Sequence, residues 1–120
     1  MINLTRISQH KLKTAPYQWA MIDDLFSPAD GAELVATYPG DQFKTVAGYD
    51  GEKGYEYESR ALIHMGSVET ADPQKLSSAW RQLAEDLVSP AYRQAMSKLT
   101  GIDLTTFAIE VNVFHYGAGS

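Results

Sequence analysis

The residue types best suited to binding or catalysis gather in the segment 106–116. Apolar and polar residues alternate there, and successive side chains of a strand point to opposite faces, so Glu110, Asn112 and Tyr116 are predicted to share one face. A carboxylate, an amide and a phenol on one face of a sheet can orient a small ligand in a pocket. A solvated polar face is equally normal for an antiparallel strand, so the spacing leaves both interpretations open.

Arg60 is a candidate for binding the carboxylate of a substrate. It falls in a second predicted strand, over residues 55–65, on the same face as Glu56 and Glu58. A guanidinium group binds a carboxylate through two parallel hydrogen bonds. The alternative is an ion pair with a neighbouring acid, which contributes little to stability.

The three histidines do not form a metal-binding pattern. His10, His64 and His115 are widely separated, and neither His-x-Asp nor His-x-Glu occurs in the sequence. A facial iron(II) site needs two histidines and a carboxylate that converge, so we do not expect these residues to assemble one by themselves. The adjacent Asp23 and Asp24 are interpreted as turn residues rather than paired catalytic acids.

Composition narrows the class of protein. A chain of 120 residues predicts a single domain, 1–120, with a real core. The absence of cysteine excludes disulfides, thiolate metal sites and a cysteine nucleophile. The net charge of −5 argues against nucleic-acid partners. Because no apolar run is long enough for a signal peptide or a membrane span, we expect a cytoplasmic protein without membrane contact.

Capping signals predict the helices that position the two strands. Ser27-Pro28 starts a helix that Pro39 ends, Asp72-Pro73 starts a second, and Ser89-Pro90 starts a third that Gly101 closes. The second helix carries an apolar face that must pack on something, formed by Leu76, Trp80, Leu83 and Leu87. We further expect a short strand over 17–26, a mobile loop over 48–54, and a glycine-rich loop over 117–120.

The segment 110–120, Glu-Val-Asn-Val-Phe-His-Tyr-Gly-Ala-Gly-Ser, resembles the opening of the barrel in iron(II)/2-oxoglutarate-dependent oxygenases of the prolyl-hydroxylase-like group. In that family a strand ending in Tyr-x-x-Gly leads into a His-x-Asp iron motif. The preceding layout is also similar, with Ile-Asp-Asp-Leu-Phe-Ser at 22–27, a helix, a strand carrying Arg60 and a long outer helix. The resemblance implies an α+β fold, an incomplete double-stranded β-helix (jelly roll) with the N-terminal helices packed outside the sheet.

The resemblance also implies a function and a set of site residues. The complete protein would use iron(II) and 2-oxoglutarate to hydroxylate or otherwise oxidise a small-molecule or peptide substrate. Tyr116 and Asn112 would bind the cosubstrate, and Arg60 and Glu110 would face the substrate. In the family pattern the iron ligands and the basic partner of 2-oxoglutarate would follow Ser120, so the chain alone is expected to bind no cofactor and to be inactive.

Two further expectations concern partners. A strand over 106–116 without its barrel neighbours exposes unpaired backbone groups, so we expect marginal stability, self-association along this edge, or completion by another polypeptide. The alternative to the oxygenase is a small non-catalytic α+β binding or protein-interaction module, whose tyrosine-rich sheet face meets a protein or a small ligand.

Overall fold

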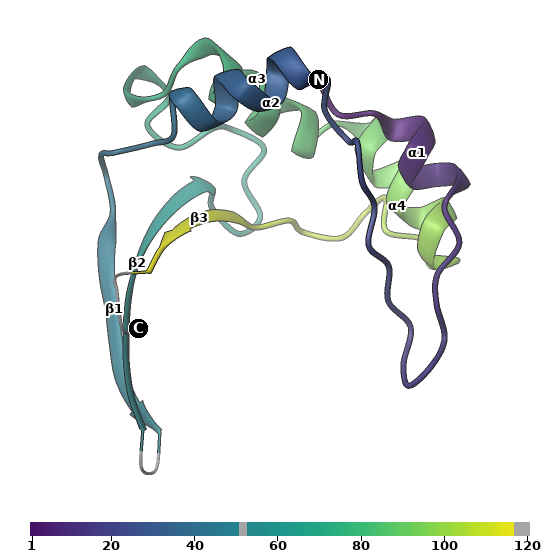
Figure 1. Cartoon of the computed structure of the whole chain (residues 1–120), viewed down its shortest axis with the longest axis horizontal. Helices are drawn as coiled ribbons and strands as arrows, with labels where there is room; N and C mark the ends of the chain where they lie inside the picture. Colours follow the sequence, from purple (N-terminus) through teal and green to yellow (C-terminus); the bar gives the residue numbers. More distant parts are fainter. Residues whose placement is uncertain (51–52, 117–120) are drawn as a thin grey trace.

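The chain folds into a small antiparallel sheet with helices packed at one end of it and beside it, an α+β arrangement (Figure 1). The computed structural model describes residues 1–50 and 53–116, and within these all side chains except those of 48–50 and 53–56. In chain order the elements are α1 (Leu4–Gln9), α2 (Pro28–Ala36), β1 (Lys44–Asp50), β2 (Lys53–Ile63), the 3-10 turn η1 (Pro73–Lys75), α3 (Ser78–Leu87), α4 (Pro90–Thr100) and β3 (Val111–His115).

Local capping defines where α2 and α4 begin, as predicted. The hydroxyl oxygens of Ser27 and Ser89 accept hydrogen bonds from the backbone N–H groups of Asp30 and Tyr92, at 3.1 and 3.2 Å. A proline follows each cap, where its missing N–H costs nothing. Gly101 closes α4 with φ 73°, a left-handed conformation that glycine adopts without strain.

The start of α3 differs from the prediction. Asp72-Pro73 opens only the turn η1, and the Asp72 side chain makes no capping hydrogen bond. The cap of α3 is Ser77, whose hydroxyl accepts from the backbone N–H of Trp80 at 3.3 Å. The second predicted helix is therefore divided into η1 and α3, because a competent cap, Ser77, lies five residues after Asp72.

The strands form a three-stranded antiparallel sheet in the order β1-β2-β3. Ser59, in the central strand β2, pairs with Lys44 of β1 on one side and with Phe114 of β3 on the other. The β2–β3 register shifts between Ala61 and Ile63. Both outer strands are edges, so in the described sheet β3 has a neighbour on one side only.

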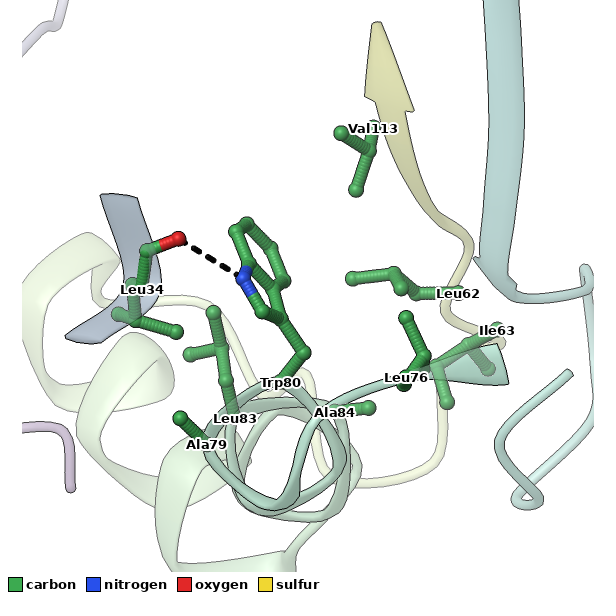
Figure 2. Close-up of a cluster of buried hydrophobic side chains, with 9 residues drawn as sticks. All are labelled: Leu34, Leu62, Ile63, Leu76, Ala79, Trp80, Leu83, Ala84 and Val113. Atoms are coloured by element: carbon green, nitrogen blue, oxygen red, sulfur yellow. Dashed lines mark hydrogen bonds between the residues drawn. The ribbon is translucent and has the colours of Figure 1, made fainter. Parts of the chain in front are cut away.

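Trp80 lies at the centre of the core, between the sheet and the helices (Figure 2). Its indole N–H donates to the backbone oxygen of Leu34 at 2.9 Å, which satisfies the one polar group of this buried ring. The predicted apolar face of α3 therefore does pack on something apolar. The buried members of the cluster are Leu34, Leu62, Ile63, Leu76, Ala79, Trp80, Leu83, Ala84 and Val113.

The helices form two groups around the sheet. In Figure 1, α2 and α3 lie at one end of the sheet, while α1 packs against α4 away from it. The sequence contained no strong signal for α1, a helix of six residues that Asn3 caps. An apolar groove separates the α1–α4 pair from the segment before α2, with Leu12, Ile22 and Leu25 among its lining.

Two expectations about strands and loops were wrong, and a third is not tested by the described residues. Residues 17–26 form no strand, and the pairing of Lys13 with Trp19 is an isolated bridge. Four residues of this segment line the groove beside α1 and α4 instead, namely Ala20, Ile22, Leu25 and Phe26. Residues 48–50 and 53–54 belong to strands rather than to a loop, while 51–52 lie outside the described residues. The expected glycine-rich loop over 117–120 also lies outside the described residues.

The third strand is shorter than the predicted 106–116. β3 begins at Val111, which pairs with Ile63, the last residue of β2. Residues before Val111 have no partner strand, and Phe107 instead closes a turn by donating its N–H to the oxygen of Leu104 at 3.3 Å. A β-branched and aromatic sequence extends as a strand only where backbone partners exist.

Candidate functional site

The register of the sheet defines two faces. Residues directly opposite each other on antiparallel strands share a face, so Lys44, Ser59 and Phe114 lie together, as do Ala61 and Asn112. We call this the open face, and the opposite one, which bears the core of Figure 2, the core face. The open face carries the polar and aromatic side chains that the sequence placed together on one side of the last strand.

A hollow of about 280 Å³ lies on the open face. Ligand pockets span roughly 300–1,000 Å³, so this one suits a small molecule. Its side chains include two amides, an ammonium, a hydroxyl and an imidazole, all able to donate hydrogen bonds, and one carboxylate. The lining residues are Gln42, Lys44, Val46, Ser59, Ala61, His64, Ala71, Asp72 and Asn112.

Asn112 lines this hollow, and a hydrogen bond to Glu110 orients the Asn112 side chain. The Asn112 amide nitrogen donates to Glu110 Oε1 at 2.9 Å, and Glu110 itself lies just before β3 and outside the lining of the hollow. The amide oxygen of Asn112 makes no hydrogen bond to the part of the chain that the structure describes. Glu110 and Asn112 therefore lie together, as predicted, and of the two only Asn112 lines the hollow.

Tyr116 lies in an aromatic cluster on the same face. Its ring centroid is 5.3 Å from that of Tyr57 and 6.3 Å from that of Phe114, and the Tyr57 and Phe114 centroids are 5.7 Å apart. Tyr116 and Phe114 remain 60% and 43% exposed, and none of the three lines the hollow. We call Tyr57, Phe114 and Tyr116 the aromatic cluster. The structure thus brings Asn112 and Tyr116 to one face but not into one pocket.

Arg60 points away from the open face and is buried, with 1% of its surface exposed. Its guanidinium donates to the backbone oxygens of Ala61 at 2.6 Å, Ala71 at 3.0 Å and Asp72 at 3.0 Å, while Nε has no partner among the described residues. Burial lowers the pKa of Arg60, and the negative charges of Asp72 and Asp41 oppose that shift. These contacts hold the segment 71–72, part of the rim of the hollow, against the end of β2.

The histidines lie apart in the folded chain. His64 lines the hollow, whereas His115 Nδ1 lies 3.6 Å from Glu58 Oε2, a residue with which it pairs across the strands. No three histidine, aspartate or glutamate side chains come together to hold a metal ion anywhere in the described ranges. The residues present therefore do not fit an iron site, and we derive no chemical step through iron.

Lys44 and Gln42 are lining residues that the sequence analysis missed, because the segment before 48 was not recognised as a strand. A signal was present. Asp50-Gly51 stands between residues 44–49 and the predicted strand 55–65, and Asp-Gly between two extended runs is a strong hairpin signature. With that hairpin, alternation along 44–50 would have placed Lys44 and Val46 on one face.

Comparison with known protein families, curated proteins and solved structures found no match to this chain. In the part of the chain that the structure describes, every helix is too short or too polar to cross a bilayer.

Proposed function

We propose that this chain supplies the first strands and the outer helices of an iron(II)/2-oxoglutarate-dependent oxygenase of the prolyl-hydroxylase-like group. The proposal extends the three-stranded sheet into a double-stranded β-helix that hydroxylates or otherwise oxidises its substrate. An antiparallel sheet whose core face packs on α3 and whose open face carries polar side chains supports it.

The position of β3 is the observation that carries the proposal. β3 is an edge strand, it contributes Asn112 to the hollow on the open face, and Tyr116 and the glycine-containing segment follow it directly. A strand that continues into further barrel strands would have this arrangement, because its free edge and its polar face would both be covered by them.

The residue roles follow from the resemblance. Tyr116 and Asn112 are proposed to hydrogen-bond 2-oxoglutarate, and Glu110 to orient Asn112 on the substrate side. Arg60 is proposed to act near the substrate by holding residues 71–72, since its N–H groups already bind backbone oxygens. The iron ligands in this proposal come from polypeptide that follows Ser120 in the family pattern.

The test is to read the gene beyond Ser120 and to express the chain with its natural continuation. A His-x-Asp shortly after Ser120, a later histidine, and succinate formation that needs both iron(II) and 2-oxoglutarate would support the proposal. Asn112→Ala and Tyr116→Phe should raise the KM for 2-oxoglutarate on the order of tenfold, as expected for one lost hydrogen bond to a charged group. Gln94→Ala, on the exposed side of α4, should leave it unchanged. A continuation without histidines would refute the proposal. So would succinate formation whose KM for 2-oxoglutarate is unchanged in both Asn112→Ala and Tyr116→Phe.

The aromatic cluster favours one alternative, a small non-catalytic binding or protein-interaction module. Exposed tyrosine and phenylalanine side chains side by side are typical of interaction surfaces. This alternative predicts that translation stops at Ser120 and that the chain binds a partner through the cluster. Reading the gene beyond Ser120 therefore separates the two functions.

A further inference from the structure

We propose that the hollow on the open face binds a small molecule carrying one carboxylate group, with Lys44 as its ion-pair partner. The proposal goes beyond the oxygenase function and does not depend on iron or 2-oxoglutarate, since it rests on the lining residues of the hollow.

Lys44 supplies a positive charge that no described residue neutralises. Its register with Ser59 places it on the open face, whereas Glu58 lies on the core face, and no ion pair involving Lys44 forms within the described residues. The one carboxylate in the lining, Asp72, interacts with the guanidinium of Arg60, which partly offsets its charge. Lys44 is thus a cation of the hollow that remains available to pair with an anion.

Hydrogen-bond donors surround this charge. Ser59 and Gln42 contribute a hydroxyl and an amide, and neither side chain is engaged in a hydrogen bond with the described part of the chain. Asn112 and His64 add an amide, already oriented by Glu110, and an imidazole. A carboxylate accepts several hydrogen bonds at once, so these donors can meet both of its oxygens.

Charge and size favour a monocarboxylate over a phosphate. One ammonium balances one negative charge, whereas phosphate sites generally combine several cations or a nest of backbone N–H groups. Val46, Ala61 and Ala71 provide an apolar part of the lining for a short hydrocarbon body. At about 280 Å³ the hollow matches a compact ligand of a few carbon atoms.

Two backbone conformations at the rim agree with a binding site. Gln42 and Asp72 line the hollow and both adopt positive φ, 67° and 46°. Such conformations are uncommon for residues other than glycine, and they concentrate where a ligand is held. The strain at Gln42 is the more informative, because aspartate tolerates this region better than glutamine does.

The test uses butyrate as the probe and butyramide as its uncharged analogue of nearly the same shape. Each is titrated into the ¹⁵N-labelled chain at low ionic strength, where ion pairs are least screened, and backbone amide shifts are followed by NMR. We expect saturable shifts at Lys44, Ser59, Ala61 and Asn112 with butyrate and much weaker ones with butyramide. Equal binding of the two, no saturable shifts, or tighter binding of inorganic phosphate than of butyrate would overturn the proposal.

Substitutions of Lys44 test whether its positive charge binds the carboxylate of butyrate. Lys44→Gln should weaken butyrate binding about fivefold, the effect of losing one partly exposed ion pair, while Lys44→Arg should retain most of it. Lys98→Gln, an exposed lysine of α4, is the matched control and should bind as the unmodified chain does. Unchanged affinity in Lys44→Gln would refute the role of Lys44. If Lys44→Gln does not fold, the test rests on Lys44→Arg, which should bind butyrate much more tightly than butyramide. Equal binding of the two by Lys44→Arg would refute the role of the charge.

Discussion

At the scale of single residues, Arg60 is the informative case. It is the one charged residue among the buried side chains of the described chain, and its N–H groups bind three backbone oxygens instead of a free ligand. A buried guanidinium is tolerated because these oxygens replace water. Since Ala71 and Asp72 also line the hollow, Arg60 can influence that site by positioning its rim.

This role predicts a loss of stability when Arg60 is changed. Arg60→Met keeps most of the side-chain volume but leaves backbone oxygens unpaired, which should lower the free energy of unfolding by about 2–3 kcal/mol. Urea denaturation measures the change. Arg81→Met, at an exposed position of α3, is the control and should have little effect. An Arg60→Met chain as stable as the unmodified one would contradict this structural role of Arg60.

At the scale of elements, serine caps define the helices and also connect them. The hydroxyl of Ser77 caps α3 and lies 2.9 Å from the hydroxyl of Thr37, the residue that ends α2. One side chain therefore links the two helices that lie at one end of the sheet, close to the contact between Trp80 and Leu34 (Figures 1 and 2).

Ser77→Ala and Ser78→Ala form a matched pair for testing this cap. The first removes the cap of α3 and the link to Thr37, and should cost about 1 kcal/mol of stability. The second changes an exposed residue of the first turn that makes no such contact, and its effect should be close to zero. Thermal unfolding followed by circular dichroism gives both values, and equal effects would contradict the assigned cap.

At the scale of the whole molecule, the open edge of β3 is the dominant feature. The radius of gyration is 16.1 Å, above the roughly 14 Å expected of a compact domain of this length. Figure 1 shows the reason, because β1 and β2 extend away from the helices. In the described sheet β3 has no strand on its outer side, although the backbone oxygen of Phe114 accepts from the Tyr38 hydroxyl at 2.7 Å. Such an edge, beside exposed aromatic rings, is a template for pairing with another strand.

We therefore expect the isolated chain to self-associate through β3 or to bind a completing polypeptide there. Sedimentation velocity should show a mass that increases with concentration, and Phe114→Lys should shift the chain toward monomer, since an exposed lysine opposes strand pairing. Phe107→Lys, also at an exposed phenylalanine but outside β3, should not. A monomer at every concentration would contradict self-association.

The sequence by itself determined the features that depend on near neighbours along the chain. The caps at Ser27 and Ser89, the end of α4 at Gly101 and the alternation that places Asn112 and Phe114 on one face all follow from contacts within a few residues. Only the tertiary structure decided where β3 begins, that Arg60 binds backbone oxygens, and that Lys44 joins Asn112 around one hollow. These features depend on which strands pair and in what register, and that is set by packing between residues far apart in the sequence.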